Sequence, residues 1–304
     1  MPREALAPVV VLGPTAVGKS VVGVEVALRS HGEIISADSR SFFRGLDIAT
    51  DKPSLVARRG VPHHLIDRVD LAEGYDAMSF RKDAARLIPA IQGRAHLPII
   101  VGGGTLYLGA ILRGIFEGPS ADEGLRKELE SRPRQELYDR LHKIDPEAAA
   151  KIHPNDRLRI VRALEVYELT GNPISVLQRR ARPLGYSFRI IGLSRERAEH
   201  RRVIADRVDG MLRRGLIDEV KRLKAKGLGP GTQVYRTIGV REVFSYLAGE
   251  IGLEELRGQI IVNTWRLVRR QLAWFRNDEG VNWLNVTGRS VDDITDEIIC
   301  RLGV

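Results

Sequence analysis

The chain has 304 residues, of which 43% are hydrophobic, so it is long and apolar enough to bury a core in one large domain or two modest ones. Its 48 Lys and Arg exceed its 39 Asp and Glu and give a formal net charge of +9, which favours a polyanionic partner, nucleic acid first, over a merely basic surface. The single cysteine, Cys300, excludes an internal disulfide framework and a zinc site built from cysteines. No window approaches the ~20 apolar residues of a membrane span. The apolar run near the start is too short for a signal peptide, so we expect a cytoplasmic protein without membrane contact.

The first predicted elements build a parallel sheet. A buried strand over residues 8–12 leads into a loop at Gly13–Gly18 and a helix at Lys19–Ser30. Two more strands are predicted over residues 32–39 and 97–104, with a helix of apolar 3.6-residue spacing between them. Strands that alternate with helices predict an α/β fold with a doubly wound sheet. Because ligands of such sheets bind at the carboxyl ends of the strands, we expect Asp38 and Gly102–Thr105 beside the loop.

The stretch GPTAVGKS, Gly13–Ser20, fits the phosphate-binding pattern G-x-x-x-x-G-K-[ST] between a strand and a helix. The backbone N–H groups of such a loop point inward as an anion nest at a helix N-terminus. Lys19 adds a positive charge, and the hydroxyl of Ser20 can reach a magnesium ion. The loop alone leaves open a nucleotide kinase, an NTPase motor and a transferase that expels pyrophosphate.

Two further residues are candidates for the chemistry. Asp38 ends the second strand, where an NTPase would use it to hold magnesium, a transferase would use it as a general base, and a turn or helix cap is the structural alternative. The strand at 97–104 ends in glycines without an acidic residue, which disfavours a motor. Arg207 falls beside the apolar face of a helix over residues 202–215, where it needs either a structural carboxylate or a ligand phosphate.

The chain changes character after residue 116. Residues 124–181 are charged and helical, and Gly/Pro breaks flank them at 118–119 and 183–185. We predict a first core part over 1–118, an inserted helical domain over 119–185 and a second core part over 186–304. In the second part a strand at 186–194 returns to the sheet, and helices follow at 241–250 and 260–276.

Two helices carry arginines that suit a nucleic-acid backbone. In 260–276, Arg266, Arg269 and Arg270 cluster opposite the apolar side, with tryptophans on the flanks and no acidic residue among them. In the insert, Arg159 and Arg162 lie three residues apart on one face, a weaker pattern. Together they suggest two basic surfaces that face a common ligand.

The ordered set of motifs resembles the tRNA dimethylallyltransferase family, the bacterial tRNA isopentenyltransferases, from about Val10 to Leu284. The stretches that carry the likeness are GPTAVGKS, GEIISADSR, FFRGLDIATDKP, PHHLID, SFRKDA, PSAD, HPNDRLRIVRALEVYELTG, RVDGMLRRGLIDEV, TIGVREV and NTWRLVRRQLAWFR. The resemblance implies a P-loop-type α/β core with an inserted, mainly helical domain. It also implies transfer of a dimethylallyl group from dimethylallyl diphosphate to N6 of the adenosine 3′ of the tRNA anticodon, with release of pyrophosphate, by a magnesium-dependent monomer.

The resemblance further implies roles for individual residues. Asp38 matches the aspartate that takes a proton from N6, and Lys19 would neutralise charge on the departing pyrophosphate. Ser20 would hold Mg²⁺. The diphosphate would be bound by Gly13, Pro14, Thr15, Ala16, Val17, Gly18, Lys19, Ser20 and Arg207. The expected tRNA contacts are Asp38, Ser39, Arg40, Ser41, Gly104, Arg126, Leu158, Arg159, Ile160, Val161 and Arg162, together with Arg266, Arg269 and Arg270. The target adenosine would have to leave its stack to reach the reacting carbon.

One motif departs from the family pattern. The family shows Gly-Gly-Thr after the third predicted strand, whereas this chain has Gly102, Gly103 and Gly104 followed by Thr105. Gly104 therefore takes the place of the family threonine. We expect Thr105 to serve in its stead as a catalytic residue through a locally altered loop; the alternative is that this hydrogen bond is missing.

Other functions compete with this interpretation. A small-molecule P-loop kinase shares the loop and the aspartate, and an adenylate prenyltransferase shares the chemistry, but neither needs the basic insert and the arginine-faced helix. A third alternative is an RNA-binding module with a vestigial loop, and the intact Lys19, Ser20 and Asp38 argue against it.

Overall fold

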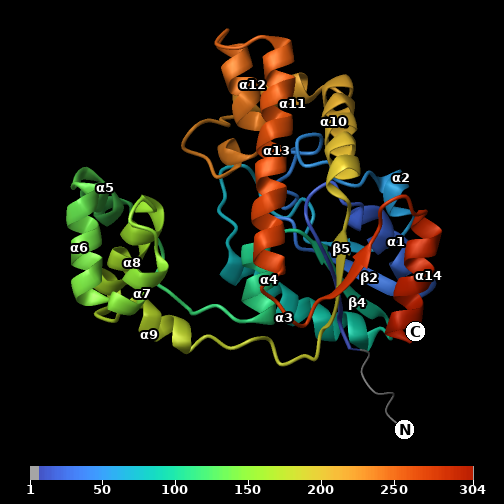
Figure 1. The fold of residues 1–304 in the computed structure, drawn as a ribbon, viewed down its shortest axis with the longest axis horizontal. Coiled ribbons are helices and arrows are strands. Elements are labelled where there is room, and N and C mark those ends of the chain that lie inside the picture. Colours follow the sequence, from blue (N-terminus) through green and yellow to red (C-terminus); the bar gives the residue numbers. More distant parts are fainter. Residues whose placement is uncertain (1–6, 304) are drawn as a thin grey trace. The chain divides into compact units, whose positions relative to one another are not determined.

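The computed structural model describes residues 7–303 and contains a six-stranded parallel sheet (Figure 1). The strands follow the order β3-β2-β4-β1-β5-β6 across the sheet. Their bounds are β1 Val9–Leu12, β2 Gly32–Ser36, β3 His63–His64, β4 Leu97–Gly102, β5 Arg189–Ser194 and β6 Asn282–Asn285. The predicted α/β fold class is confirmed.

Helices cover both faces of this sheet, which is why its central strands read as continuous apolar runs. Val9, Val11 and Ile99 share one buried cluster with α1 (Lys19–Arg29) and α14 (Val291–Leu302). The alternate positions Val10 and Ile100 point to the other face and are also fully buried. The helix α3 (Ala77–Gly93) packs against β2 and β4. The helix α4 (Thr105–Leu112) follows β4 directly.

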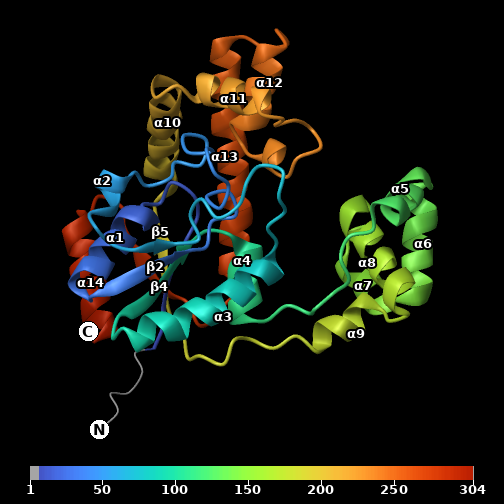
Figure 2. The same cartoon turned by 180° about the vertical axis from the view of Figure 1, so that it is seen from behind.

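The later part of the chain adds a group of helices above the carboxyl ends of the strands (Figures 1 and 2). These are α10 (Arg197–Arg213), α11 (Leu216–Ala225), the short 3₁₀ helix η1 (Val234–Arg236), α12 (Val240–Leu247) and α13 (Leu253–Phe275). The helix α10 packs along α13, and α12 packs against both α11 and α13. A single turn of helix, α2 (Leu55–Arg58), precedes β3.

Several predicted boundaries shift. The second strand ends at Ser36, so Asp38 stands in the loop after it, and the third ends at Gly102. The helix predicted over 260–276 begins earlier, at Leu253, where Glu254 and Glu255 in the first turn favour the helix dipole. The strands β3 and β6 and the helix α14 were not predicted.

Contacts within the chain separate a compact helical unit, Ala110–Leu184, from the rest. It contains α5 (Glu123–Ser131), α6 (Arg134–Ile144), α7 (Pro146–Lys151), α8 (Arg157–Thr170) and α9 (Ile174–Arg179). Leu137, Ile160 and Leu164 are fully buried in its own apolar core. Asp145 ties this unit together, because its carboxylate accepts the N–H of Ala148 and the N–H of Ser175, both at 2.9 Å. Within residues 7–303, no helix has the length and apolarity that a membrane crossing requires.

Candidate functional site

The phosphate loop takes the shape that an anion nest requires. Gly13, Ala16 and Gly18 have positive φ angles of 152°, 62° and 106°, which turn successive N–H groups toward the inside of the loop. A Cβ at Gly13 would lie 2.6 Å from the carbonyl oxygen of Leu193, so only glycine fits there. Val17 is buried and supplies only its backbone to the loop.

Residues from α10 and α13 hold the loop from outside. The N–H of Thr15 donates to Oε1 of Gln271 at 2.9 Å, and Nε2 of Gln271 donates to the carbonyl of Gly103 at 2.7 Å. Nε2 of the buried His200 donates to the carbonyl of Thr15 at 2.8 Å. Burial lowers the pKa of His200, which keeps the ring neutral. The loop is therefore pre-shaped by partners far from it in sequence.

The ammonium group of Lys19 lies at the mouth of this nest. Nζ donates to the carbonyl of Pro14 at 2.7 Å. Burial lowers the pKa of Lys19 to about 7, against the attraction of Asp38 and with a smaller contribution from Arg207. An anion bound in the loop would favour the charged form of this lysine.

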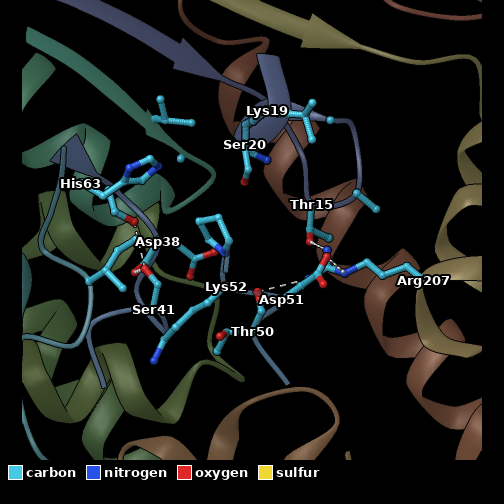
Figure 3. A pocket seen from close by; sticks show the side chains of 18 of the residues that line it. Thr15, Lys19, Ser20, Asp38, Ser41, Thr50, Asp51, Lys52, His63 and Arg207 are labelled. Atoms are coloured by element: carbon cyan, nitrogen blue, oxygen red, sulfur yellow. Dashed lines mark hydrogen bonds and ion pairs between the residues drawn. The ribbon is translucent and has the colours of Figure 1, made fainter. Parts of the chain in front are cut away.

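Arg207 reaches the loop from α10. Its Nη1 donates to Oγ1 of Thr15 at 2.7 Å, and its Nη2 to the carbonyl of Thr50 at 3.4 Å. Its Nε lies 3.3 Å from Oδ2 of Asp51 but is buried without a hydrogen bond, while Asp51 also pairs with Arg214 at 2.6 Å. Arg207 therefore has a structural carboxylate in Asp51 and also reaches the loop at Thr15 (Figure 3).

Asp38 stands opposite Arg207. Its Oδ1 accepts the N–H of Arg40 at 2.9 Å, which is the turn role that the sequence left as the structural alternative. The side chain is exposed toward the site, and no hydrogen bond from residues 7–303 engages its second oxygen. One carboxylate oxygen is held and the other is free for chemistry.

Two cavities meet between these residues. The loop cavity has a volume of about 640 Å³, and the α13 cavity about 450 Å³. Thr15, Asp38, Thr50 and Arg207 line both of them. Figure 3 shows the loop cavity, with Thr15 and Arg207 on one side and Asp38, Ser41 and His63 on the other. Its other lining residues include Lys19, Ser20, Lys52, Ile34, Ile66 and Val101, and those of the α13 cavity include Thr105, Tyr107, Gln233, Thr237, Arg270 and Gln271.

The loop after β4 explains the displaced threonine. The N–H of Gly104 donates to the carbonyl of Ala37 at 3.1 Å, and a Cβ at Gly104 would lie only 2.6 Å from that oxygen. A threonine at position 104 therefore requires this backbone to move. Thr105 is the half-buried first residue of α4 and lines the α13 cavity instead.

The residues expected to contact tRNA near Asp38 have mixed surroundings. Ser41 is buried, and its hydroxyl lies 2.9 Å from that of Ser36 and donates to the carbonyl of Asp38 at 3.0 Å, so its side chain is already engaged inside the protein. Ser39 and Arg40 are half-buried, and Nη1 of Arg40 donates to the carbonyl of Gln233 at 2.9 Å. On α13, the predicted arginines Arg266, Arg269 and Arg270 are all exposed.

The residues expected to contact tRNA from the helical unit need a correction. Ile160 and Val161 are buried in its core, because they fall on the inner face of α8, and their side chains are therefore removed from the set of surface contacts. Leu158 and Arg159 are exposed. Arg126 and Arg162 both pair with the fully buried carboxylate of Glu165, at 2.8 and 2.6 Å, and keep part of their side chains accessible: 39% and 32%, respectively.

Sequence reasoning did not identify several residues of this site. Gln271 is a buried polar side chain on the inner side of α13, and its place among apolar residues at helical spacing is the signal that could have marked it, because such a side chain needs buried partners. Asp51, Thr50 and Gln233 lie in irregular segments, where no pattern marks them. Within residues 7–303, no cluster of three His, Cys, Asp or Glu side chains is arranged to hold a metal ion.

Comparisons with known proteins point in one direction. The family profile described as IPP transferase matches residues 41–278. The tRNA dimethylallyltransferase of Thermotoga petrophila is 45% identical over 292 residues, 95% of each chain, and that of Pelotomaculum thermopropionicum is 44% identical over 302 residues, 97% of this chain and 96% of the other.

Solved structures agree with these sequence relatives. The full-length tRNA isopentenylpyrophosphate transferase from Bacillus halodurans superposes with a TM-score of 0.73 at 40% identity, covering 98% of this chain and 97% of the other. A eukaryotic dimethylallyltransferase acting on tRNA superposes with a TM-score of 0.83 at 28% identity, covering 97% of this chain and 79% of the other.

Proposed function

The chain belongs to the tRNA dimethylallyltransferase family, and from this premise we propose how its site works. The protein transfers a dimethylallyl group from dimethylallyl diphosphate to N6 of the adenosine 3′ of the anticodon in tRNA and releases pyrophosphate. The observation that carries the mechanism is the junction of two cavities at Thr15, Asp38, Thr50 and Arg207. The small-molecule kinase and the adenylate prenyltransferase that the loop alone left open are set aside by the family.

The loop cavity takes the donor. Its nest of N–H groups, Lys19 and Arg207 converge where a diphosphate would lie, and charge-assisted hydrogen bonds of this kind are the strong ones. The apolar side chains of Ile34, Ile66 and Val101 line the same cavity and suit the dimethylallyl carbons. The phosphate loop therefore binds a leaving group and not a group to be transferred.

The donor atoms near the loop fit a magnesium ion. Mg²⁺ prefers oxygen ligands and is commonly held by one or two protein groups together with substrate phosphates. Ser20 and Asp38 line the loop cavity and offer a hydroxyl and a carboxylate, while the diphosphate brings its own oxygens. When bound, the ion would neutralise charge on the departing pyrophosphate, and Ser20 is the residue proposed to hold it.

The reaction is a displacement at the first carbon of the dimethylallyl group. The N6 lone pair forms a bond to this carbon, the carbon–oxygen bond breaks, and its electron pair leaves on pyrophosphate. Asp38 takes a proton from N6, using the carboxylate oxygen that Arg40 does not engage. Lys19 and Arg207 stabilise the negative charge that builds on the leaving group.

The α13 cavity takes the acceptor base. A base that enters it lies against the side chains of Tyr107, Met211 and Leu267 and meets polar groups from Gln233 and Thr237. Such a mixture suits a flat ring with a hydrogen-bonding edge, and the base must be extruded from its stack to enter. Thr105 lines this cavity, and we assign it the role of the family threonine.

The surrounding tRNA is bound through exposed arginines. Arg266, Arg269 and Arg270 on α13 contact phosphates, and the helical unit contributes Arg126, Leu158, Arg159 and Arg162.

A labelled-donor assay tests this function. The protein is mixed with Mg²⁺, dimethylallyl diphosphate labelled in its prenyl group and either unmodified tRNA or AMP. We expect label in tRNA only. Label in AMP, or phosphate transfer from ATP to a small molecule without prenylation, contradicts the proposal.

A further inference from the structure

A second surface feature lies outside both cavities, between α10 and α13. Arg197, Arg201, Trp265, Arg266 and Arg269 line a hollow of about 520 Å³, with Ile204, Ile261 and Val262 as its apolar floor. We call it the α10–α13 groove. Val262 is 49% exposed, although it is a large apolar side chain, so the floor of the groove is open to solvent.

The positive charge of this groove is uncompensated. Among residues 7–303, no carboxylate pairs with Arg197, Arg201 or Arg269, and Arg266 donates only to the amide oxygen of Asn263 at 3.0 Å. Other arginines of the same two helices do have carboxylates: Arg207 of α10 lies 3.3 Å from Asp51, and Arg257 of α13 pairs with Asp209 at 2.5 Å. The groove thus brings together four arginines of α10 and α13 without a carboxylate partner, an arrangement that is complementary to a polyanion.

An aromatic ring stands among these arginines. The guanidinium carbon of Arg201 lies 5.1 Å from the centre of a Trp265 ring, and that of Arg197 lies 5.9 Å from it. Arginines beside a partly exposed tryptophan are the combination with which proteins hold phosphates and stack unpaired bases.

Contact with His200 holds the Trp265 ring in place. The ring of His200 packs edge-on against Trp265, with centroids 5.8 Å apart and an interplanar angle of 89°, and the same histidine bonds to the carbonyl of Thr15. The wall of the groove is therefore braced against the phosphate loop, which reduces the entropy lost when a ligand binds there.

On α13 the groove and the α13 cavity meet at one edge. Arg266 lines the groove and Arg270 lines the cavity, and the two arginines lie one turn apart, about 6 Å along the axis and about 40° around the helix. The other lining residues point to different sides of α13, with Trp265 and Arg269 toward the groove and Thr264 toward the cavity. A polynucleotide that contacts Arg270 beside the cavity can continue over Arg266 into the groove.

We propose that the α10–α13 groove binds the sugar–phosphate backbone of the substrate tRNA next to the extruded adenosine, through Arg197 and Arg201 with Trp265 as a stacking surface. This inference rests on the proposed function, since it takes the α13 cavity as the acceptor site. It adds the α10 arginines Arg197 and Arg201 to the residues expected to contact tRNA.

The test compares two double variants of the full chain. Arg197→Gln with Arg201→Gln removes the two α10 arginines of the groove. Arg202→Gln with Arg222→Gln is the matched control, because these exposed arginines line neither the groove nor the loop and α13 cavities, and the same charge is lost. The dissociation constant for unmodified tRNA is measured between about 50 and 200 mM salt, and transfer is measured in parallel.

The expected effect follows from counterion release. Each phosphate contact contributes a slope of ~0.7 in log K against log salt for single strands and ~0.9 for duplex, so two lost contacts lower the slope by ~1.4–1.8. At about 0.1 M salt this corresponds to binding weakened by ~25–60-fold. The KM for tRNA should rise while kcat and the affinity for dimethylallyl diphosphate stay unchanged.

The inference is overturned if the groove variant binds tRNA with the same affinity and salt slope as the control. The same result is expected if the groove binds a protein partner and not tRNA. Unchanged donor binding in the same preparation shows that the variant is folded. Absence of prenyl transfer by the unmodified protein counts against the proposed function alone, because the binding comparison does not depend on turnover.

Discussion

The protein should take up a proton at Lys19 when it binds dimethylallyl diphosphate. Burial lowers the pKa of this lysine to about 7 in the free protein. At pH 8 its side chain is therefore neutral in about nine-tenths of the protein molecules. A diphosphate in the loop favours the charged form and raises this pKa, so binding at pH 8 should take up ~0.9 proton. The association constant should fall about tenfold for each pH unit above 7, until the pKa of the complex is reached.

Calorimetry of dimethylallyl diphosphate without tRNA measures this uptake. Titrations at pH 8 in two buffers of different ionisation enthalpy give the number of protons bound. Lys19→Arg is the matched control, because arginine keeps the positive charge and does not lose it at this pH, so the uptake should disappear. A binding enthalpy that is independent of buffer in the unmodified protein, or an uptake that persists in Lys19→Arg, refutes the reasoning.

Three other predictions concern single residues. Asp38→Asn should leave the tRNA dissociation constant unchanged and lower kcat by ~10²–10⁴, and normal turnover with lost tRNA binding would contradict the general-base role. Thr105→Ala should lower kcat by about fivefold through loss of one hydrogen bond worth ~1 kcal/mol, and an unchanged single-turnover rate would show that Thr105 does not replace the family threonine. Glu33 is 3% exposed, and hydrogen bonds from Arg94, together with His64 and His96, lower its pKa from 4.5 to about 2. Its stabilisation is therefore complete above pH 4.5 and is lost as the pH falls toward 2. Glu33→Gln should unfold more easily in urea by about 2–3 kcal/mol at pH 7, with a smaller difference at pH 3; an equal difference at both pH values would exclude this cause.

The parts of the site that follow from the sequence are those encoded by local patterns. The stretch from Gly13 to Ser20 carries its own geometry in its glycines, and a parallel sheet brings the loops after its strands to one edge. For this reason Asp38 and Thr105 were expected beside the phosphate loop, and both line cavities there. The place of Arg207 beside an apolar face was likewise visible in helical spacing.

Contacts between distant segments were not predictable in the same way. Gln271 bonds to Thr15 across 256 positions, and the carboxylate that faces Arg207 comes from Asp51 in an irregular segment. The strands β3 and β6 span only His63–His64 and Asn282–Asn285, too short to show an alternating pattern. The α10–α13 groove could not be predicted from the sequence either, because its arginines come from two helices and the packing of these helices forms it.

The central claim is that N6 of the adenosine 3′ of the anticodon is the acceptor. It is tested most directly with two tRNA transcripts that differ only at this position, one with adenosine and one with inosine, which lacks the exocyclic amine. After incubation with labelled dimethylallyl diphosphate and Mg²⁺, the adenosine transcript should yield one labelled nucleoside on digestion, and the inosine transcript should yield none. Equal labelling of both transcripts, or label at another nucleoside, would contradict the account.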